Sequence, residues 1–349
     1  MSGEIEVGIL GATGTVGQEF IAQLRDHPWF TVTWLGASER SAGKTYRDAT
    51  PWRLPVQRPD RVADMMVERV TPGHAPKLVF SSLDASVAGD VETAFAQAGH
   101  VVVSNARNHR MDPLVPLVIP EVNADHLELL GAQSEARGWS GRIVTNPNCS
   151  TIMLVMALAP LRQFGLRQVI VSTLQAVSGG GYPGVASLDI VGNVVPIVRG
   201  EEPKMETETK KILGQATQDG VEPHPVVVSA STTRVPVING HTELATVALE
   251  TDPGQEVLVT AMREFVGRPQ EAGLPSAPAR PILYMDEDDR PQPRLDADRD
   301  GGMAVCVGRL RPCPVLGYKF VTMGHNTVRG AAGAAVLNAE LLKLDGVLD

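Results

Sequence analysis

The sequence predicts an α/β protein: a Rossmann-type dinucleotide-binding domain with a parallel sheet, and a second domain of mixed α+β character. Three observations predict this. A short apolar strand runs into a glycine-rich turn and a helix within the first 26 residues. Strand-like and helical stretches then alternate up to about residue 104, which is typical of a doubly wound sheet. The composition changes near residue 149, and 349 residues are sufficient for about two domains of ~150 residues each.

The elements of the first domain follow from apolar periodicity and from β-branched content. The predicted strands are 5–10, 31–35, 77–80 and 100–104, and the predicted helices are 18–26 and 87–98. The glycine-rich turn, 11–17, lies between the first strand and the first helix. Strands that alternate with helices in this way indicate parallel pairing.

The second half of the chain predicts a different mixture. Helices are expected at 151–161, 201–213 and 330–343, and strands at 168–176, 225–231, 242–250, 305–310 and 318–322. A glycine cluster, 178–184, follows the strand 168–176. The stretch 286–300 contains seven acidic and three basic residues and predicts a solvated loop.

Charge and hydropathy exclude several classes of protein. The chain has 31 Lys and Arg against 40 Asp and Glu, a formal net charge of −9. We therefore expect no binding of nucleic acid or of an anionic membrane by bulk charge, and an anionic ligand must be held locally by a few cations. The sequence contains no run of eighteen apolar residues, so we expect no membrane-spanning helix. The N-terminus, MSGEIEVGILGATG, lacks the basic region and the cleavage site of a signal peptide.

The three cysteines are spaced for neither a metal site nor a disulfide framework, so we expect no metal and reduced thiols in a cytoplasmic protein. Cys149 lies in NPNCST (146–151) at the start of a predicted helix, where the helix dipole and free N–H groups lower a thiol pKa toward the thiolate. A lone cysteine is more often a buried structural residue, but the polar neighbours of Cys149 favour a reactive thiol. Cys306 has apolar neighbours and is expected in the core, and Cys313 is expected in a loop.

The turn GATGTVG (11–17) predicts a dinucleotide site. Glycines let backbone N–H groups approach a pyrophosphate, which the helix N-terminus attracts. An ordinary βα turn has the same glycines, but strand, turn and helix together favour a dinucleotide. The second strand ends in ASERSAGK (37–44), where Arg40 and the hydroxyls of Ser38 and Ser41 suit the 2′-phosphate of NADP. Glu39 could instead accept from the ribose 2′-OH of NAD, and a plain charged surface turn is the remaining alternative; we favour NADP.

A reactive thiol needs a partner for proton transfer. Of the eight histidines, His241 is the best candidate, because it ends the turn RVPVINGH (234–241) that begins at Arg234 and enters the second sheet. His27, His109 and His126 are expected at the surface and not in catalysis. The spacing alone places neither Arg234 nor His241 opposite Cys149.

Several segments together resemble the aspartate-semialdehyde dehydrogenase family, and in particular its archaeal and fungal branch. They occur in the order of the family and span nearly the whole chain. The segments are GATGTVGQEF (11–20), ASERSAGK (37–44), SNARNHRMDPLVPLVIPEVN (104–123), TNPNCSTIM (145–153), LQAVSGGGYPGVASLDIVGNVVP (174–196), EEPKMETETKKIL (201–213), RVPVINGHTE (234–243) and HNTVRGAAGAAVLN (325–338).

The resemblance implies a role for each matching position. Cys149 matches the nucleophile and His241 the acid–base residue. The substrate positions are Gln175, which orients the substrate, Arg234 for its carboxylate, Glu201 for its amino group, and Arg110 and Lys204 for phosphate. The cofactor positions are Gly11, Thr13, Gly14, Thr15 and Val16 in the turn, Ser38 and Ser41 at the 2′-phosphate, and Ser178, Gly179 and Asn326 near the nicotinamide. Asn148 and N–H groups at the helix start could hold a developing oxyanion.

The resemblance also implies a reaction. Cys149 would add to an aldehyde to give a thiohemiacetal, with His241 taking the hydroxyl proton; hydride transfer to NADP⁺ would leave a thioester that inorganic phosphate attacks. In the biosynthetic direction, NADPH would reduce L-aspartyl-4-phosphate to L-aspartate-4-semialdehyde, on the route to lysine, threonine and methionine. Residues 1–148 and 325–349 would form the NADP-binding domain, and 149–324 an inserted catalytic and dimerisation domain. We expect a homodimer or a homotetramer.

Other functions stay open at this stage. Thr232, Thr233 and Pro203 depart from the usual pattern of the branch close to the substrate positions. Because the branch includes malonyl-CoA reductases, an NADPH-dependent acyl-CoA reductase is the alternative enzyme; an N-acetyl-glutamyl-phosphate reductase fits the flanking segments less well. A non-catalytic NADP-binding regulator is the alternative from another class, and the polar surroundings of Cys149 argue against it.

Overall fold

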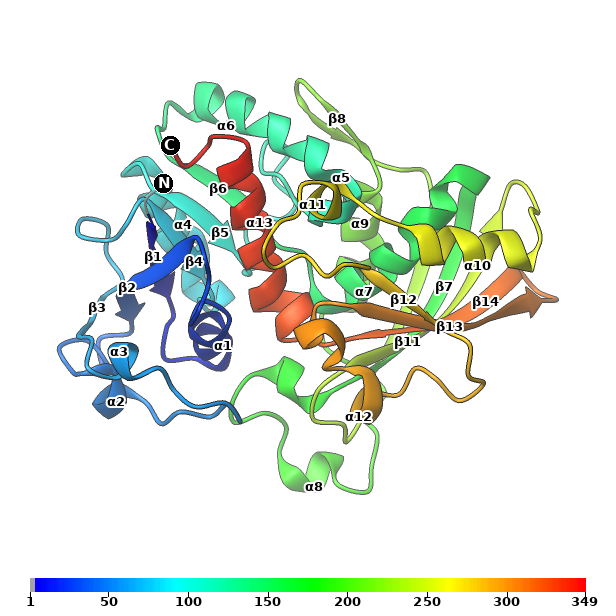
Figure 1. Ribbon diagram of the computed structural model, residues 1–349, viewed down its shortest axis with the longest axis horizontal. Helices are drawn as coiled ribbons and strands as arrows, with labels where there is room; N and C mark the ends of the chain where they lie inside the picture. Colours follow the sequence, from blue (N-terminus) through cyan, green and yellow to red (C-terminus); the bar gives the residue numbers. More distant parts are fainter. Residues whose placement is uncertain (1–3) are drawn as a thin grey trace.

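A parallel six-stranded sheet forms one side of the computed structural model, which describes residues 4–349 (Figure 1). The strands lie in the order β3-β2-β1-β4-β5-β6 and pair in parallel throughout. Their bounds are β1 Ile5–Leu10, β2 Phe30–Ala37, β3 Val67–Arg69, β4 Leu78–Ser81, β5 Val101–Ser104 and β6 Arg142–Thr145. The predicted Rossmann-type fold is confirmed. Its strand order reverses between β1 and β4, the place where such sheets bind ligands beyond the carboxyl ends of their strands.

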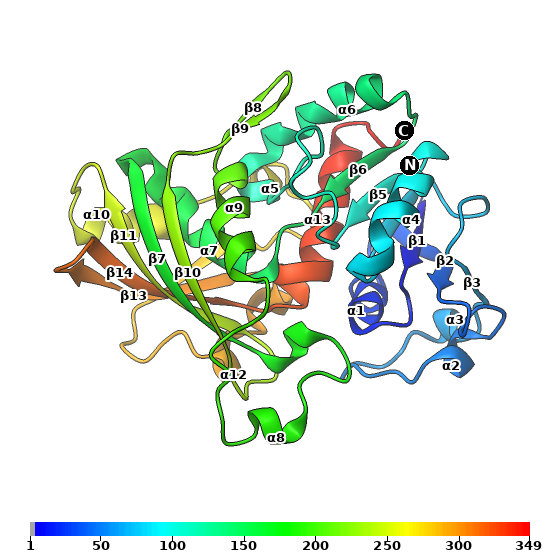
Figure 2. The ribbon, with the colours of Figure 1, turned by 180° about the vertical axis from the view of Figure 1, so that it is seen from behind.

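Helices cover both faces of this sheet, so its strands are continuous apolar runs. Every residue of β4 and β5 is buried. Helices α1 (Thr15–Gln23) and α13 (Gly333–Leu344) share one apolar cluster with the sheet, and α4 (Ala85–Gln97) belongs to the cluster on the other face. The C-terminal helix α13 therefore packs on the first sheet, although the whole second sheet precedes it in the chain (Figures 1 and 2).

The second sheet is mixed and has the order β10-β7-β11-β14-β13-β12. The pairs β10–β7 and β12–β13 are parallel, and the other three pairs are antiparallel. The bounds are β7 Leu166–Gln175, β10 Val227–Arg234, β11 His241–Leu249, β12 Ile282–Met285, β13 Val305–Cys313 and β14 Gly317–Gly324. Buried and exposed residues alternate along β7 and β10, so one face of this sheet packs on the core and the other faces outward.

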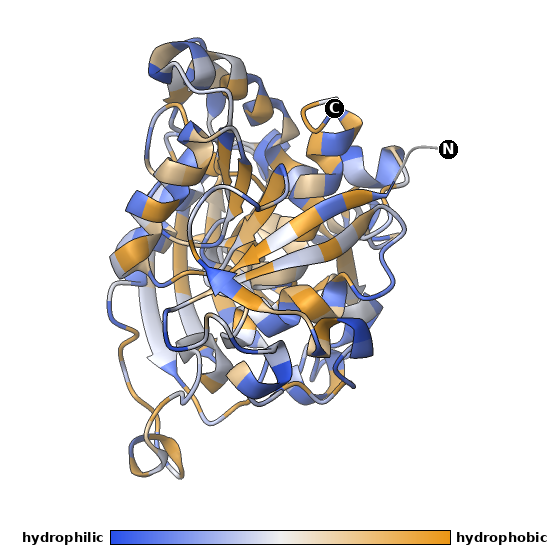
Figure 3. Ribbon diagram, turned by 90° about the vertical axis from the view of Figure 1, so that its left-hand side faces the viewer, coloured by the Kyte–Doolittle hydropathy of each residue, from blue (hydrophilic) through white to orange (hydrophobic). Residues whose placement is uncertain are grey.

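Helix α7 (Cys149–Leu158) lies between the two sheets and is apolar on all sides. Every residue from Ser150 to Leu158 is buried. The helix packs against β11 and β14 of the second sheet, and also against the π-helical turn Val328–Ala332 that precedes α13. Figure 3 shows hydrophobic residues along the strands at the centre of the molecule. Because α7 is enclosed on every side, the position of its first residue is fixed as well.

The remaining elements are short or lie at the edges of the two layers. They are α2 Tyr46–Ala49, α3 Asp60–Ala63, α5 Pro120–Asn123, α6 Leu129–Arg137, α8 Ser187–Ile190, α9 Glu202–Ile212, α10 Gln255–Glu264, α11 Arg268–Glu271, α12 Pro293–Asp296, β8 Gln215–Thr217, β9 Gly220–Glu222, and the 3-10 helices Ala124–Glu128, Ala159–Phe164, Val177–Gly180 and Arg299–Gly302. Among residues 4–349, no helix is both long enough and apolar enough to cross a membrane.

The stretch 286–300 is not a solvated loop throughout, so that prediction is wrong in part. It contains α12, and Asp296 in this helix is fully buried. Asp296 forms an ion pair with Arg290 and accepts the backbone N–H of Gln292 at 2.7 Å. A charge-rich composition suggests solvent, but a carboxylate can be buried when partners satisfy its oxygens. The residues from Asp286 to Asp289 are exposed, as predicted.

The surface positions predicted for two histidines are also wrong. His126 is fully buried between the side chain of Asn123 and the carbonyl of Gly214. His27 donates from Nε2 to the buried carboxylate of Glu340 at 2.7 Å, because its Nδ1 accepts backbone N–H groups. Both histidines find partners that lie far away in the sequence, which their polar neighbours did not reveal.

The buried ion pair between Arg329 and Glu121 should be important for stability. Both side chains are fully buried, and two hydrogen bonds of 2.7 Å join them. Arg329→Leu would leave the carboxylate of Glu121 buried without a partner, so we expect the free energy of unfolding to fall by about 3–5 kcal/mol. Urea denaturation followed by circular dichroism measures this. Arg25→Leu, which breaks a solvent-exposed pair with Asp26, is the control and should have little effect; equal losses in the two variants would contradict the prediction.

Candidate active site

Cys149 is the first residue of α7 and follows shortly after the carboxyl end of β6. Asn148 is the N-cap of the helix: its side-chain oxygen accepts the N–H groups of Ser150 and Thr151 at 3.1 and 3.2 Å. Cys149 is partly exposed, while the rest of the helix is buried. The predicted place of the thiol at a helix start is confirmed.

The segment after β14 approaches Cys149 from the other side. A Cβ atom at Gly330 would lie 2.7 Å from the Cβ of Cys149, a distance that only glycine permits without displacement. Gly330 belongs to the π-helical turn that leads into α13 and so to the core of the first sheet. The thiol therefore lies where the two layers meet.

The thiolate expected at the helix start is not the state of the free protein. Burial raises the pKa of Cys149 to about 12, and the carboxylate of Glu201 acts in the same direction, against the smaller effects of Arg110 and Arg234. Desolvation outweighs the dipole of a ten-residue helix here. Cys149 therefore retains its proton at neutral pH until a reaction step removes it.

Three neighbouring strands of the second sheet bring predicted site residues together at one end of the sheet, which we call its edge. Strand β10 ends at Arg234 and β7 at Gln175, and these two residues are partners in the parallel pairing. Strand β11 runs antiparallel to β7 and begins at His241. Arg234 donates to the carbonyl of Ala176 at 2.6 Å, and its charge acts on the thiol of Cys149. These strand ends therefore lie near Cys149, a proximity that the spacing in the sequence did not establish.

His241 is neutral and has a defined tautomer. Its Nδ1 accepts the backbone N–H of Ala176 at 3.0 Å, so the ring proton is on Nε2. Burial, and then the charges of Arg234 and His325, lower the pKa of His241 to about 3. Within residues 4–349, Nε2 has no hydrogen-bond partner. His241 thus offers a buried N–H donor with no partner.

Because Gly179 has no side chain, the space beside Arg234 and His241 stays free. A Cβ atom there would lie 3.0 Å from Nη1 of Arg234 and 3.1 Å from Nε2 of His241. Next to it, Asn326 accepts from the backbone N–H of Gly240 at 2.9 Å and donates to the hydroxyl of Ser178 at 2.8 Å. The structure therefore brings Ser178, Gly179 and Asn326 together beside His241.

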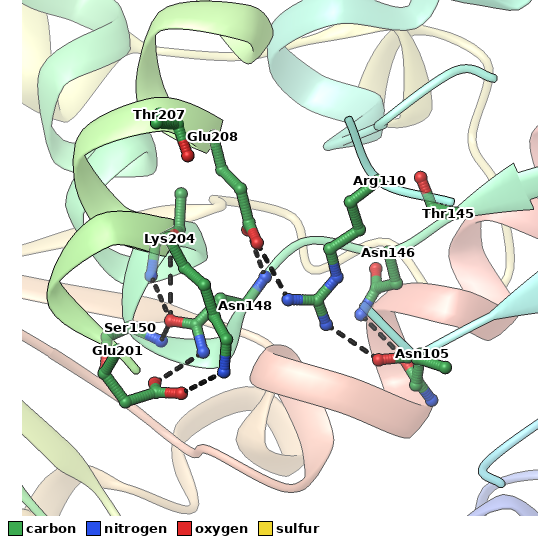
Figure 4. Close-up of polar contacts among 12 residues, drawn as sticks. Asn105, Arg110, Thr145, Asn146, Asn148, Ser150, Glu201, Lys204, Thr207 and Glu208 are labelled. Carbon is green, nitrogen blue, oxygen red and sulfur yellow. Dashed lines mark hydrogen bonds and ion pairs between the residues drawn. The ribbon is translucent and has the colours of Figure 1, made fainter. Parts of the chain in front are cut away.

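Helix α9 and its N-cap residue, Glu201, place three charged side chains against the start of α7 (Figure 4). Glu201, Lys204 and Glu208 are three and four residues apart, so they lie on one face of the helix. Glu201 accepts from the side-chain amide of Asn148 and from Lys204, both at 2.6 Å. Glu208 accepts from the backbone N–H of Asn148 at 2.7 Å and from Arg110 at 2.9 Å. The four predicted substrate positions Arg110, Asn148, Glu201 and Lys204 thus belong to one network.

This network gives Asn148 a role other than the oxyanion donor that the sequence suggested. Its side-chain oxygen caps α7, and its amide nitrogen donates to Glu201. The side chain therefore fixes the start of the helix. Nε2 of His241, in contrast, is a donor with no hydrogen-bond partner among residues 4–349.

The glycine turn fits the pyrophosphate of a dinucleotide. Gly11 has φ = +81°, and a Cβ atom there would lie 2.9 Å from the carbonyl oxygen of Ser82, so the turn requires glycine. Gly14 caps α1 without a side-chain hydrogen bond, and Thr13, Thr15 and Val16 are partly exposed around it. The first N–H groups of α1 are therefore open to an anion. The turn lies at β1 and β4, where the strand order reverses.

The turn after β2 is similarly open. The N–H of Ser41 donates to the carbonyl of Ser38 at 2.8 Å, and Ser38 and Arg40 are exposed. The arrangement leaves a hydroxyl and a guanidinium available to a phosphate group. Among the described residues, no group of three or more His, Cys, Asp or Glu is arranged to hold a metal ion.

Sequence reasoning missed two residues of α9. Glu208 joins Arg110 to Asn148, and Lys211 is a buried cation three residues further on. The helical spacing 201–204–208 was a signal for Glu208, because it repeats on the face that holds the two predicted substrate residues. Nothing in the sequence pattern marked Lys211.

Two family models match most of the chain. The model described as semialdehyde dehydrogenase, NAD binding domain, matches residues 6–130, and the model described as semialdehyde dehydrogenase, dimerisation domain, matches residues 158–329. A relative named aspartate-semialdehyde dehydrogenase from Methanothermobacter thermautotrophicus is 50% identical over 97% of this chain and 99% of its own. One of the same name from Cryptococcus neoformans var. neoformans is 50% identical over 99% of this chain and 98% of its own.

Solved structures agree with these relatives. The aspartate semialdehyde dehydrogenase of Candida albicans, crystallised with NADP, has a TM-score of 0.91 and 42% identity, covering 99% of this chain and 100% of its own. The aspartate semialdehyde dehydrogenase II of Vibrio cholerae, complexed with ASA, has a TM-score of 0.78 and 28% identity, with 99% of each chain covered.

The raised pKa of Cys149 predicts how its alkylation depends on pH. A thiol reacts through its thiolate, so below the pKa of about 12 the rate with iodoacetamide should rise about tenfold per pH unit from pH 7 to 9. Quenched labelling followed by peptide mass spectrometry measures the rate at each cysteine. Cys149→Ser is the control for assignment. A rate that reaches a plateau below pH 8 would mean that the free protein already holds a thiolate.

Proposed function

The chain belongs to the aspartate-semialdehyde dehydrogenase family, and we propose that it catalyses the NADPH-dependent reductive dephosphorylation of L-aspartyl-4-phosphate to L-aspartate-4-semialdehyde. One observation carries the proposal: the charges of Arg234, at the end of β10, and of Arg110, in the segment that follows β5, both act on the thiol of Cys149 at the start of α7. A nucleophile thus lies between cations that suit a substrate with a carboxylate and a phosphate. The neighbour from Candida albicans holds NADP, which supports NADP as the cofactor here.

The thiol and the imidazole are both neutral in the free protein, and this suggests the order of events. As the sulfur of Cys149 attacks the acyl carbon, the C–O bond to phosphate breaks, and the thiol proton leaves with the phosphate. His241, with a pKa of about 3, is a poor acceptor for that proton. The product of this step is a thioester on Cys149.

NADPH, when bound, supplies a hydride to the carbonyl carbon of this thioester. The oxygen of the resulting thiohemiacetal carries negative charge, and the Nε2–H of His241 is the donor that can stabilise it. The C–S bond then breaks, the semialdehyde leaves, and the sulfur takes a proton from solvent. In this tautomer His241 donates a hydrogen bond, which refines the acid–base role that the resemblance implied.

The cations support the placing of both anionic groups. Arg234 is mostly buried and is proposed to bind the substrate carboxylate, and Glu201 the substrate amino group. Arg110 and Lys204 are proposed to bind phosphate. Each of these two cations has a carboxylate partner in the free protein, and Nε of Arg110 has no partner among the described residues. Inorganic phosphate therefore has a donor available at Arg110.

Two of the three departures that suggested an acyl-CoA substrate, Thr232 and Pro203, have structural explanations. Thr232 is buried, and its hydroxyl accepts the backbone N–H of Val198 at 3.1 Å. Pro203 lies in the first turn of α9, where its missing N–H removes no helical hydrogen bond. These residues support the fold around the site, so they do not favour malonyl-CoA over the acyl phosphate.

The outer face of the second sheet is the proposed surface for a homodimer. Ile170 and Leu174 on β7, Val227 on β10 and Leu244 on β11 are exposed apolar residues on this one face. They lie within the segment matched by the dimerisation-domain model. Contiguous exposed apolar residues of this kind indicate an interface. A tetramer and a cytoplasmic location stay predictions.

A kinetic assay with the proposed substrates tests this function. With L-aspartate-4-semialdehyde and NADP⁺, the protein should form NADPH at a rate that saturates with inorganic phosphate. Cys149→Ala should lower kcat by on the order of 10⁴-fold or more while NADP⁺ binding persists. Arg234→Leu should raise the KM for the semialdehyde by about 100-fold, and the KM for phosphate much less. Oxidation of NADPH by malonyl-CoA, without any phosphate-dependent reaction, would sink this function in favour of the acyl-CoA reductase.

The dimer is tested by a charge on its proposed face. Leu244→Asp would place a carboxylate in the centre of an apolar interface, so the mass in sedimentation equilibrium should fall toward the 37.2 kDa of one chain. Val87→Asp, at an exposed apolar position on α4, is the matched control and should leave the mass unchanged. A dimer that survives Leu244→Asp would place the interface elsewhere.

A further inference from the structure

Lys211 of α9 binds the chain segment that carries Arg110. Its side chain is buried, with 5% of the residue exposed. The ammonium donates to the carbonyl oxygens of Arg110 at 2.8 Å, Asp112 at 2.7 Å and Val115 at 2.8 Å. An ammonium has three hydrogens, so every donor of Lys211 is engaged with the backbone of residues 110–115.

This burial is unfavourable for the lysine itself. Desolvation lowers the pKa of Lys211 to about 8, although the carboxylates of Asp112 and Glu208 act to raise it. A buried ammonium is tolerated only where its hydrogen bonds offset the loss of hydration. Here all three bonds go to one irregular segment, so the shape of residues 110–115 is what the buried charge stabilises.

The same helix also holds the side chain of Arg110. Glu208, one turn before Lys211, accepts from Nη1 of Arg110 at 2.9 Å and from the backbone N–H of Asn148 at 2.7 Å (Figure 4). The other terminal nitrogen of Arg110 donates to the carbonyl of Asn105 at 2.7 Å. Helix α9 thus fixes the backbone of Arg110 through Lys211 and its guanidinium through Glu208. One helix therefore sets the place of Arg110 relative to the start of α7.

We propose that Lys211 is a positioning residue for phosphate: it holds residues 110–115 so that Arg110 meets the phosphate group beside Cys149. This inference rests on the proposed function, in which Arg110 binds phosphate. Lys211 itself has no hydrogen left for a substrate. Its loss should therefore weaken the binding of phosphate and leave the other two substrates in place.

Steady-state kinetics of Lys211→Met separates a positioning role from a general loss of structure. With semialdehyde, NADP⁺ and inorganic phosphate, the KM for phosphate should rise at least about tenfold, because an oriented charge-assisted contact is lost. The KM values for semialdehyde and NADP⁺ should stay within about twofold. Lys210→Met, at the adjacent half-buried lysine of the same helix, is the matched control and should leave all three values unchanged.

Lys211→Arg is the second variant, for the case in which Lys211→Met does not fold. It keeps the buried positive charge, but a planar guanidinium cannot direct three hydrogens from one nitrogen, so the KM for phosphate should still rise about threefold or more. A folded variant of either kind with an unchanged KM for phosphate overturns the inference.

Hydrogen exchange gives a readout that does not depend on activity. Amides of residues 105–115 should exchange faster in the Lys211 variants than in the wild type and in Lys210→Met, while those of α7 stay protected. Unchanged exchange in 105–115 overturns the inference. If the rate of the wild-type protein does not depend on phosphate, the proposed function fails. If the wild-type rate depends on phosphate and the Lys211 variants show the same KM for phosphate, only the positioning role fails.

Discussion

The hydrogen bonds around Asn148 are the constraint on which the rest of the site depends. This residue caps α7 with its side-chain oxygen, and two carboxylates of α9 bind it, Glu201 at the side chain and Glu208 at the backbone. Because α7 is enclosed by the second sheet, α9 and the turn Val328–Ala332, its start cannot shift without opening the core. The nucleophile is therefore held at the junction of the two layers, where the glycine turn of one sheet and the edge of the other can serve the same reaction.

In the free protein, the reactive groups of the site are uncharged and its cations are paired with carboxylates. Burial keeps the thiol of Cys149 protonated and the ring of His241 uncharged, and Arg110 and Lys204 already have carboxylate partners. A chain with a net charge of −9 can thus bind small anions at a few cations while the remainder of its surface stays acidic. In the proposed mechanism, reactivity depends on the substrate, whose phosphate accepts the thiol proton and whose acyl oxygen is stabilised by His241.

The parts of the fold that depend on local pattern could be predicted from the sequence. The glycine turn, the apolar strands of the first sheet and the cysteine at a helix start all follow from short motifs. Contacts between distant residues could not be predicted: Arg110 and Glu208 are 98 residues apart, and no periodicity joins them. The same limit explains the error for His126, which contacts the carbonyl of Gly214, 88 residues away. Asp296 is different, because its partner Arg290 is only six residues away and the charge-rich composition concealed a local ion pair. The pKa of Cys149 depends on desolvation that a helix-start motif does not reveal.

In the proposed reaction Cys149, held at the start of α7, carries the acyl group of the substrate. Mass spectrometry of the intact protein, mixed with freshly prepared L-aspartyl-4-phosphate in the absence of NADPH, tests this directly. We expect one aspartyl group per chain, located on the peptide that contains Cys149 and removed when inorganic phosphate is added. A chain that stays unmodified, or that is acylated at Cys306 or Cys313 instead, would contradict this reaction.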